Sequence, residues 1–179
     1  MIAVVAQEAA RLAVSSDYAV VSGGAKGVDQ LAMRAALEAD GQVIAVLADS
    51  LVRQLREPEA RQAVIDGRVC MCTPYKPTAG FSVANAMGRN KLIYALADAT
   101  FVVASDHEKG GTWAGAIEAL RADYTDVAVW SGDECGSGNP ALIGRGGRAI
   151  ARVEQLFPLV AKLSQQTPSP SSAQLALDM

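Results

Sequence analysis

Three clusters of residues have types and spacings that suit the binding of phosphate groups. The first follows an apolar, β-branched run and precedes a helical pattern. A strand, a glycine-rich turn and a helix start in direct succession point backbone N–H groups and the positive end of a helix dipole at one place. Lys26 adds a positive charge to this turn. The sequence therefore predicts an anion site at Ser22, Gly23, Gly24, Lys26 and Gly27. A turn that holds no ligand is the alternative interpretation.

The second cluster is Arg89-Asn90-Lys91, inside a predicted helix over residues 83–97. The guanidinium of Arg89 supplies a fixed fork for phosphate, and the amide of Asn90 can bind a base edge or a sugar. Arg89 and Lys91 stand two positions apart, so they point in different directions on a helix and only one can face a site squarely. A solvated basic turn is the alternative interpretation.

The third cluster is Gly110-Gly111-Thr112, between a predicted strand and a predicted helix. Thr112 suits an N-cap or a phosphate contact. Glu118 on the same helix is either a surface carboxylate or, in a hydrolase, a catalytic group. Two helix starts and an arginine at one edge favour the binding of nucleotide or nucleic-acid phosphates without catalysis.

The elements that position these clusters alternate between strands and helices. Apolar runs predict strands over residues 18–22, 42–48, 68–73, 100–104 and 126–130, and helical spacing predicts helices over 2–14, 28–39, 51–65, 83–97 and 112–121. This alternation predicts an α/β fold, a Rossmann-like, doubly wound and mostly parallel sheet with helices on both faces. Ligands of such sheets bind beyond the carboxyl ends of the strands, so the glycine turns should share one edge.

The length of 179 residues indicates one domain, predicted over residues 1–164. Residues 131–147 are predicted to be loop, apart from a turn near 140–143, and residues 149–163 a closing helix. The polar, proline-rich residues 165–179 are predicted to form a mobile tail.

Composition limits the functional classes. The formal net charge of −3 argues against a generally basic nucleic-acid surface but leaves room for a local basic pocket. No apolar run approaches the length of a membrane span and no signal peptide is evident, so a cytoplasmic location is expected. Three cysteines and one histidine lack metal-site spacing, so neither a metal nor a cofactor is predicted.

Two of the clusters carry a family resemblance. Residues 21–29, Val-Ser-Gly-Gly-Ala-Lys-Gly-Val-Asp, resemble the S-G-x-A-[RK]-G-[IV]-D turn of the DNA-processing protein A family, also called DprA or Smf. Phe81, residues 88–93 and residues 96–99 resemble that family's F-x-x-R-N-[RK]-x-I-x-x-L-[SA]-D segment, with a longer insertion after the phenylalanine. The turn at residues 110–112 lies where the family has a second small-residue turn.

This resemblance implies a Rossmann-like protein that binds single-stranded DNA in a pocket, helps load a recombinase during transformation and forms a homodimer. It also implies phosphate contacts by Ser22, Gly23, Lys26, Gly27, Arg89, Asn90 and Lys91. The family usually begins with an extra strand that carries a glycine-rich turn, whereas this sequence starts at or within the helix after it. The family's flanking helical and winged-helix domains have no counterpart here, and Thr73 replaces a common glutamate.

A second family of the same superfamily, the LONELY GUY phosphoribohydrolases, is similar over residues 109–118. In that interpretation the protein hydrolyses nucleoside 5′-monophosphates, Arg89 holds the phosphate, and Glu118 assists cleavage of the N-glycosidic bond. The proline and the second Gly-Thr pair of that family's motif are missing. A nucleotide-sensing signalling module is a third interpretation, suggested by the predicted tail and the acidic net charge.

Overall fold

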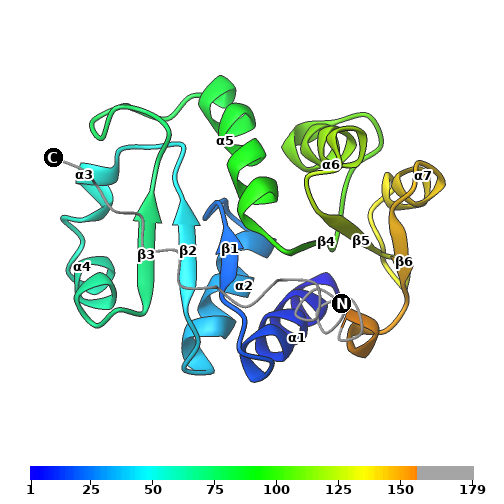
Figure 1. Cartoon of the computed structure of the whole chain (residues 1–179), viewed down its shortest axis with the longest axis horizontal. Coiled ribbons are helices and arrows are strands. Elements are labelled where there is room, and N and C mark those ends of the chain that lie inside the picture. Colours follow the sequence, from blue (N-terminus) through cyan, green and yellow to red (C-terminus); the bar gives the residue numbers. More distant parts are fainter. Residues whose placement is uncertain (157–179) are drawn as a thin grey trace, which may run out of the picture.

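The computed structural model describes residues 1–156, and its elements alternate between helices and strands through most of that length (Figure 1). The strands are β1 (Val20–Ser22), β2 (Val43–Val46), β3 (Val69–Cys72), β4 (Ala99–Val102), β5 (Asp126–Trp130) and β6 (Arg148–Ile150). The helices are α1 (Ile2–Ser15), α2 (Val28–Glu38), α3 (Leu51–Gln54), α4 (Pro58–Ile65), α5 (Val83–Leu96), α6 (Gly110–Ala122) and α7 (Asn139–Gly144), with a 3₁₀ turn, η1 (Val153–Leu156).

The strands form two parallel sheets of three strands each, in the orders β1-β2-β3 and β4-β5-β6. In the first sheet Val21 is opposite Ile44 and Ile44 is opposite Cys70, and in the second Val102 is opposite Val129. Across the molecule the strands follow the order β3, β2, β1, β4, β5, β6 (Figure 1). The predicted α/β, Rossmann-like class is therefore confirmed, although β1 and β4 do not pair with each other.

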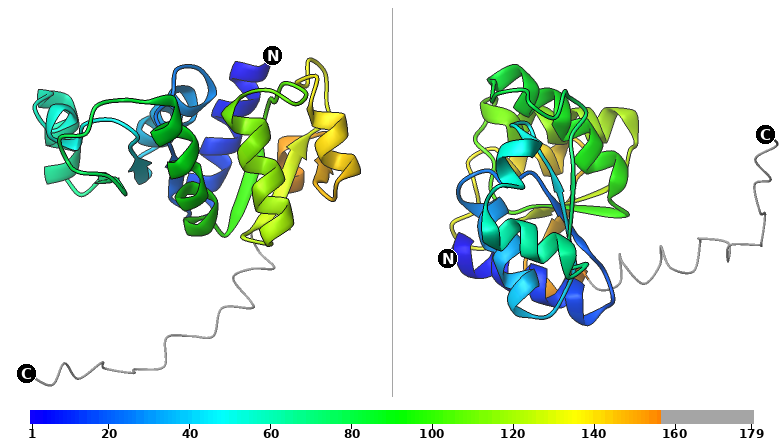
Figure 2. Two further views of the ribbon diagram at one scale, coloured as in Figure 1. Left: turned by 90° about the horizontal axis from the view of Figure 1, so that it is seen from above. Right: turned by 90° about the vertical axis from the view of Figure 1, so that its left-hand side faces the viewer.

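Helices cover both faces of the strands. Along β5, Ala128 and Trp130 pack with residues of α1 and η1, whereas Val127 and Val129 pack with residues of α5, α6 and α7. Because successive side chains of a strand point to opposite faces, these two core clusters lie on opposite sides of the sheet. Figures 1 and 2 show the same division, with α1 and α2 on one side and α5 and α6 on the other.

Local signals explain where the helices near the site begin. The hydroxyl of Ser82 accepts a hydrogen bond from the N–H of Asn85 and caps α5. Pro58 occupies the first turn of α4, where no N–H is needed, so the broken helical stretch predicted over residues 51–65 is two helices.

The prediction beyond residue 131 is wrong in two places. The expected loop contains the helix α7, and the described part of the expected helix over residues 149–163 is the strand β6 followed by η1. A turn at Gly146 and Gly147 brings Arg148–Ile150 alongside β5, and pairing with this buried strand outweighs local helical spacing. The predicted tail at 165–179 lies outside the described residues. None of the described helices is long and apolar enough to cross a membrane.

Candidate nucleic-acid interface

A cavity of about 970 Å³ opens between β1 and β4 and extends to the carboxyl ends of these strands. Seven of the predicted phosphate ligands line it: Ser22, Lys26, Arg89, Asn90, Gly110, Gly111 and Thr112. The two glycine turns thus share one edge of the molecule, as expected for the carboxyl side of parallel strands.

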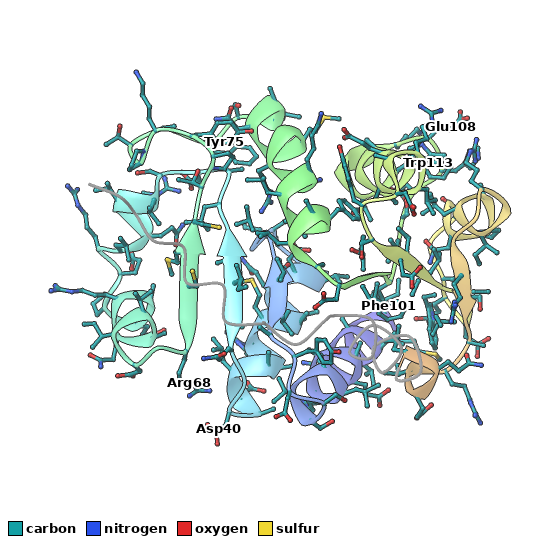
Figure 3. All side chains as sticks on the ribbon, viewed as in Figure 1. Asp40, Arg68, Tyr75, Phe101, Glu108 and Trp113 are labelled. Carbon is teal, nitrogen blue, oxygen red and sulfur yellow. The ribbon has the colours of Figure 1, made fainter. Side chains whose placement is uncertain are left out.

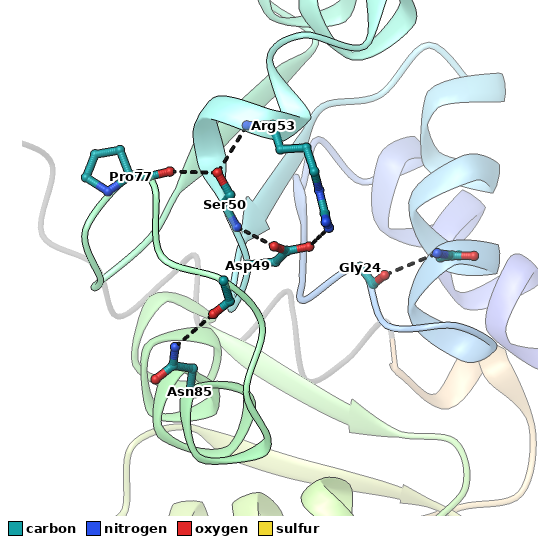
Figure 4. Close-up of polar contacts among 8 residues, drawn as sticks. Gly24, Asp49, Ser50, Arg53, Pro77 and Asn85 are labelled. Carbon is teal, nitrogen blue, oxygen red and sulfur yellow. Dashed lines mark hydrogen bonds and ion pairs between the residues drawn. The ribbon is translucent and has the colours of Figure 1, made fainter.

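The first glycine turn is shaped by a carboxylate within the chain. Asp29, in the first turn of α2, accepts hydrogen bonds from the N–H groups of Gly23 and Ala25, both at 3.2 Å. These are among the donors that the sequence offered to a phosphate, and in this structure they point at Asp29. Gly24 and Gly27 have positive φ angles of 68° and 101°, which favour glycine. The carbonyl of Gly24 accepts from the Gln30 amide at 3.2 Å (Figure 4).

Arg89 lies under this turn and is the most unusual charge of the site. Its side chain is only 5% exposed, and its guanidinium donates to the carbonyls of Val46 and Ala86. Among the described residues no carboxylate lies within 4.0 Å of it. Burial lowers the pKa of the guanidinium, while the charges of Asp29 and Tyr75 act in the opposite direction. A buried cation without an ion pair is costly, which makes the position receptive to an anion.

Asn90 connects α5 to the second glycine turn. Its amide donates to the carbonyl of Gly111 at 3.2 Å. The α6 helix begins at Gly110, so the start of this helix and the basic helix α5 are held together at the cavity. Thr112, which follows, is exposed at the same edge.

Lys91 and Glu118 lie apart from this cavity. The ammonium of Lys91 is 2.9 Å from a carboxylate oxygen of Glu118, and this hydrogen bond raises the pKa of Lys91. Both residues line a separate, smaller hollow between α5 and α6. The structure therefore places Arg89 and Asn90 together at the main cavity and turns Lys91 away, as their spacing on a helix requires. Arg89 and Glu118 line different cavities.

Two positioning groups had no clear signal in the sequence. The hydroxyl of Tyr75 donates to the carbonyl of Asn85 at 2.8 Å and lies against Gly88 on α5. Figure 3 shows Tyr75 beside α5. The hydroxyl of Ser50 donates to the carbonyl of Pro77, and Asp49 contacts Arg53 (Figure 4). These bonds tie the loops after β2 and β3 to each other and to α5. Neither group stands in a recognisable motif, because both act through contacts distant in sequence.

Comparison with known proteins agrees with the Rossmann-like class of the fold. The profile of the family described as DNA recombination-mediator protein A matches residues 2–161. The chain therefore belongs to the DNA recombination-mediator protein A family.

Individual relatives support this membership. A putative DNA processing protein DprA from Mycobacterium tuberculosis is 30% identical over 168 residues, which cover 88% of this chain and 42% of the relative. The chain thus spans less than half the length of the curated relatives that it matches.

Solved structures share the fold. DNA processing protein A from Streptococcus pneumoniae superposes with a TM-score of 0.71 at 22% identity, covering 88% of this chain and 56% of the other. The protein from Helicobacter pylori, described for its single-stranded DNA binding mode, gives 0.68 at 19% identity, with coverages of 90% and 74%. A molybdenum cofactor carrier protein from Chlamydomonas gives 0.61 at 21% identity, with coverages of 92% and 88%.

Proposed function

We propose that this protein binds single-stranded DNA through its phosphates at the carboxyl edge of β1 and β4, without catalysis. The observation that carries the proposal is the buried guanidinium of Arg89, which faces the cavity with no carboxylate partner among the described residues. Membership of the DNA recombination-mediator protein A family supports nucleic acid as the source of the anion.

The surroundings of Arg89 support the same ligand. Lys26 lies exposed on the turn above it, and the start of α6 contributes a second positive pole at the cavity. The site thus offers three kinds of phosphate contact: the fixed guanidinium fork of Arg89, the flexible ammonium of Lys26 and the start of α6. These contacts suit successive phosphates of single-stranded DNA. The Asn90 amide and the rim residue Phe81, 65% exposed, are available to a base or a sugar.

Titration of the full chain with fluorescent oligo-dT at two salt concentrations tests this proposal. Arg89→Lys keeps the charge but loses the fork, and we expect affinity to fall about tenfold, the value of one charge-assisted hydrogen bond. Lys26→Ala removes one phosphate contact, so we expect the slope of log K against log salt to become shallower by about 0.7.

Arg121→Ala is the matched control, because Arg121 is an exposed cation in the last turn of α6 and does not line the cavity. We expect its affinity to equal that of the unmodified chain. Equal losses of oligo-dT affinity in Arg121→Ala and Lys26→Ala would show that DNA binding depends only on the overall charge of the protein. Unchanged affinity in both Lys26→Ala and Arg89→Lys would reject the cavity as the interface.

We infer a cytoplasmic protein that forms a homodimer and cooperates with a recombinase, which is supported by the family resemblance. The hydrolase alternative has weaker support, because Glu118 is engaged by Lys91 at a hollow separate from that of Arg89. Release of free base from AMP would support that alternative, and Glu118→Gln would then abolish it.

A further inference from the structure

The strand β3 carries two free cysteines, and one of them lies on the surface. Cys70 is exposed and Cys72 is half-buried. Free cysteine is among the most buried residue types in proteins, because it behaves as a small apolar side chain that fills space in a core. Packing therefore does not account for Cys70, which leaves the chemistry of its thiol.

Both thiols lie on the same face of β3. Successive side chains of a strand point to opposite faces, so Cys70 and Cys72 share one face. Val69 and Met71 point to the other face, where they pack with residues of α2 and α4. β3 is the outermost strand of its sheet, and α5 contacts β1 and β2 on the cysteine side (Figure 1). The cysteine face of β3 is therefore open to solvent at Cys70.

The two thiol groups are close enough to influence each other's ionisation. Burial raises the pKa of the Cys72 thiol, and the neighbouring Cys70 raises it further. A second negative charge beside the first is unfavourable, so the pair retains its protons until a cation replaces them. A cation that binds both sulfurs removes this repulsion, since the thiolate is the form of cysteine that binds metals.

The spacing on the strand favours a bridging ion over a disulfide. Side chains two positions apart on one face of a strand have Cβ atoms about 6.6 Å apart, whereas a disulfide needs about 4 Å. Two metal–sulfur bonds of about 2.3 Å, placed in line, separate the sulfurs by about 4.6 Å. Two cysteine side chains that lean toward each other from this spacing can reach that separation.

The number of ligands selects the kind of ion. Within residues 1–156 no group of three or more histidine, cysteine, aspartate or glutamate side chains could hold a metal ion. Structural zinc sites and iron–sulfur clusters take four such ligands. Two thiolates alone suit a soft monovalent cation that accepts two ligands in line, and copper(I) is the ion of this kind that thiolates select.

We propose that Cys70 and Cys72 bind one copper(I) ion in a two-coordinate thiolate site on the open face of β3. Binding forms two copper–sulfur bonds and releases both thiol protons to the solvent, and the copper keeps its oxidation state. Neither cysteine lines the cavity that contains Arg89, so this inference is independent of the proposed DNA binding.

Competition with bicinchoninate, a coloured copper(I) ligand, tests the site in the reduced full chain under nitrogen. We expect the native chain to withdraw one copper(I) ion per chain from the competitor. Cys70→Ser and Cys72→Ser should each lower the copper(I) affinity about a hundredfold or more, because two ligands on one strand act at high effective concentration. Native affinity in either variant would overturn the proposal.

Cys135→Ser is the matched control, because Cys135 is the remaining cysteine of the chain and packs against a separate core cluster. We expect this variant to bind copper(I) with the affinity of the native chain. Equal losses of affinity in all three serine variants would show adventitious binding to thiols and would reject the site.

X-ray absorption of the copper-loaded native chain measures the coordination without any substitution. We expect two sulfur neighbours for each copper(I) ion. Four sulfur neighbours, with one ion for every two chains, would contradict the two-coordinate site and assign the ion to thiols shared by two copies.

Mild oxidation of the metal-free chain provides a check on the spacing. We expect no disulfide between Cys70 and Cys72 in peptide maps of the folded protein, because their side chains are too far apart. Ready formation of this disulfide would contradict the geometry on which the copper(I) site rests.

Discussion

At the scale of single residues, the candidate site is organised by the contact between Gly23 and Arg89. A Cβ added at Gly23 would overlap the guanidinium group of Arg89. Glycine is therefore required here for space, whereas Gly24 and Gly27 are suited to their positive φ angles. The glycine motif can be recognised in the sequence. Gly23 and Arg89 are 66 positions apart, however, so the sequence does not show why the first glycine of the motif must be small.

We predict that Gly23→Ala displaces the guanidinium of Arg89 and lowers oligo-dT affinity about as much as Arg89→Lys, roughly tenfold. The loss arises because the fork can no longer reach the phosphate, and oligonucleotide titration measures it. Gly80→Ala is the control, because a Cβ there meets nothing within 4 Å. Wild-type affinity in Gly23→Ala would show that Arg89 does not need its present position.

At the scale of elements, a buried asparagine holds the second sheet together. Asn139, at the start of α7, is 0% exposed. Its amide accepts from the N–H of Ser105 at 2.9 Å and donates to the carbonyls of Val103 and Trp130 at 3.0 and 2.8 Å. One side chain thus ties the ends of β4 and β5 to α7. This role of Asn139 could not be predicted from the sequence, because residues 131–147 are predicted to be loop apart from a turn near 140–143.

Replacement of this side chain should destabilise the fold. Asn139→Ala leaves three buried backbone groups without partners, so we expect the free energy of unfolding to fall by about 3 kcal/mol or more. Chemical denaturation measures this change. Asn85→Ala is the control, because the Asn85 side chain makes one long contact of 3.4 Å to Gly80, and we expect a loss below about 1 kcal/mol. Similar losses of unfolding free energy in Asn139→Ala and Asn85→Ala would contradict a special structural role of Asn139.

At the scale of the whole molecule, an acidic chain presents a small basic site. The formal net charge is −3, yet Lys26 and Arg89 meet at one cavity from elements far apart in sequence. Binding by so few cations should be local and should have a modest dependence on salt. A broad basic surface would have a much steeper dependence.

We therefore predict a slope of log K against log salt of about −1.5 to −2 for oligo-dT, equivalent to two or three phosphates at 0.7 per contact on a single strand. Titrations over a range of salt concentrations measure the slope. A slope steeper than about −4 would require more cations than this cavity holds and would place much of the interface elsewhere.

The sequence by itself determined the α/β class, the positions of the glycine turns and the opposite directions of Arg89 and Lys91. These features depend on strand and helix periodicity and on local turn chemistry, which act over a few residues. It could not determine that Asp29 already holds the N–H groups of the first turn, or that Arg89 is buried with no ion pair to any residue in the described range 1–156.

Only the tertiary structure decided that the strands form two ladders with a cavity between β1 and β4. It also decided that residues 148–150 pair with β5 as a strand. Pairing and burial depend on neighbours that are distant along the chain, and local propensity carries no information about those neighbours.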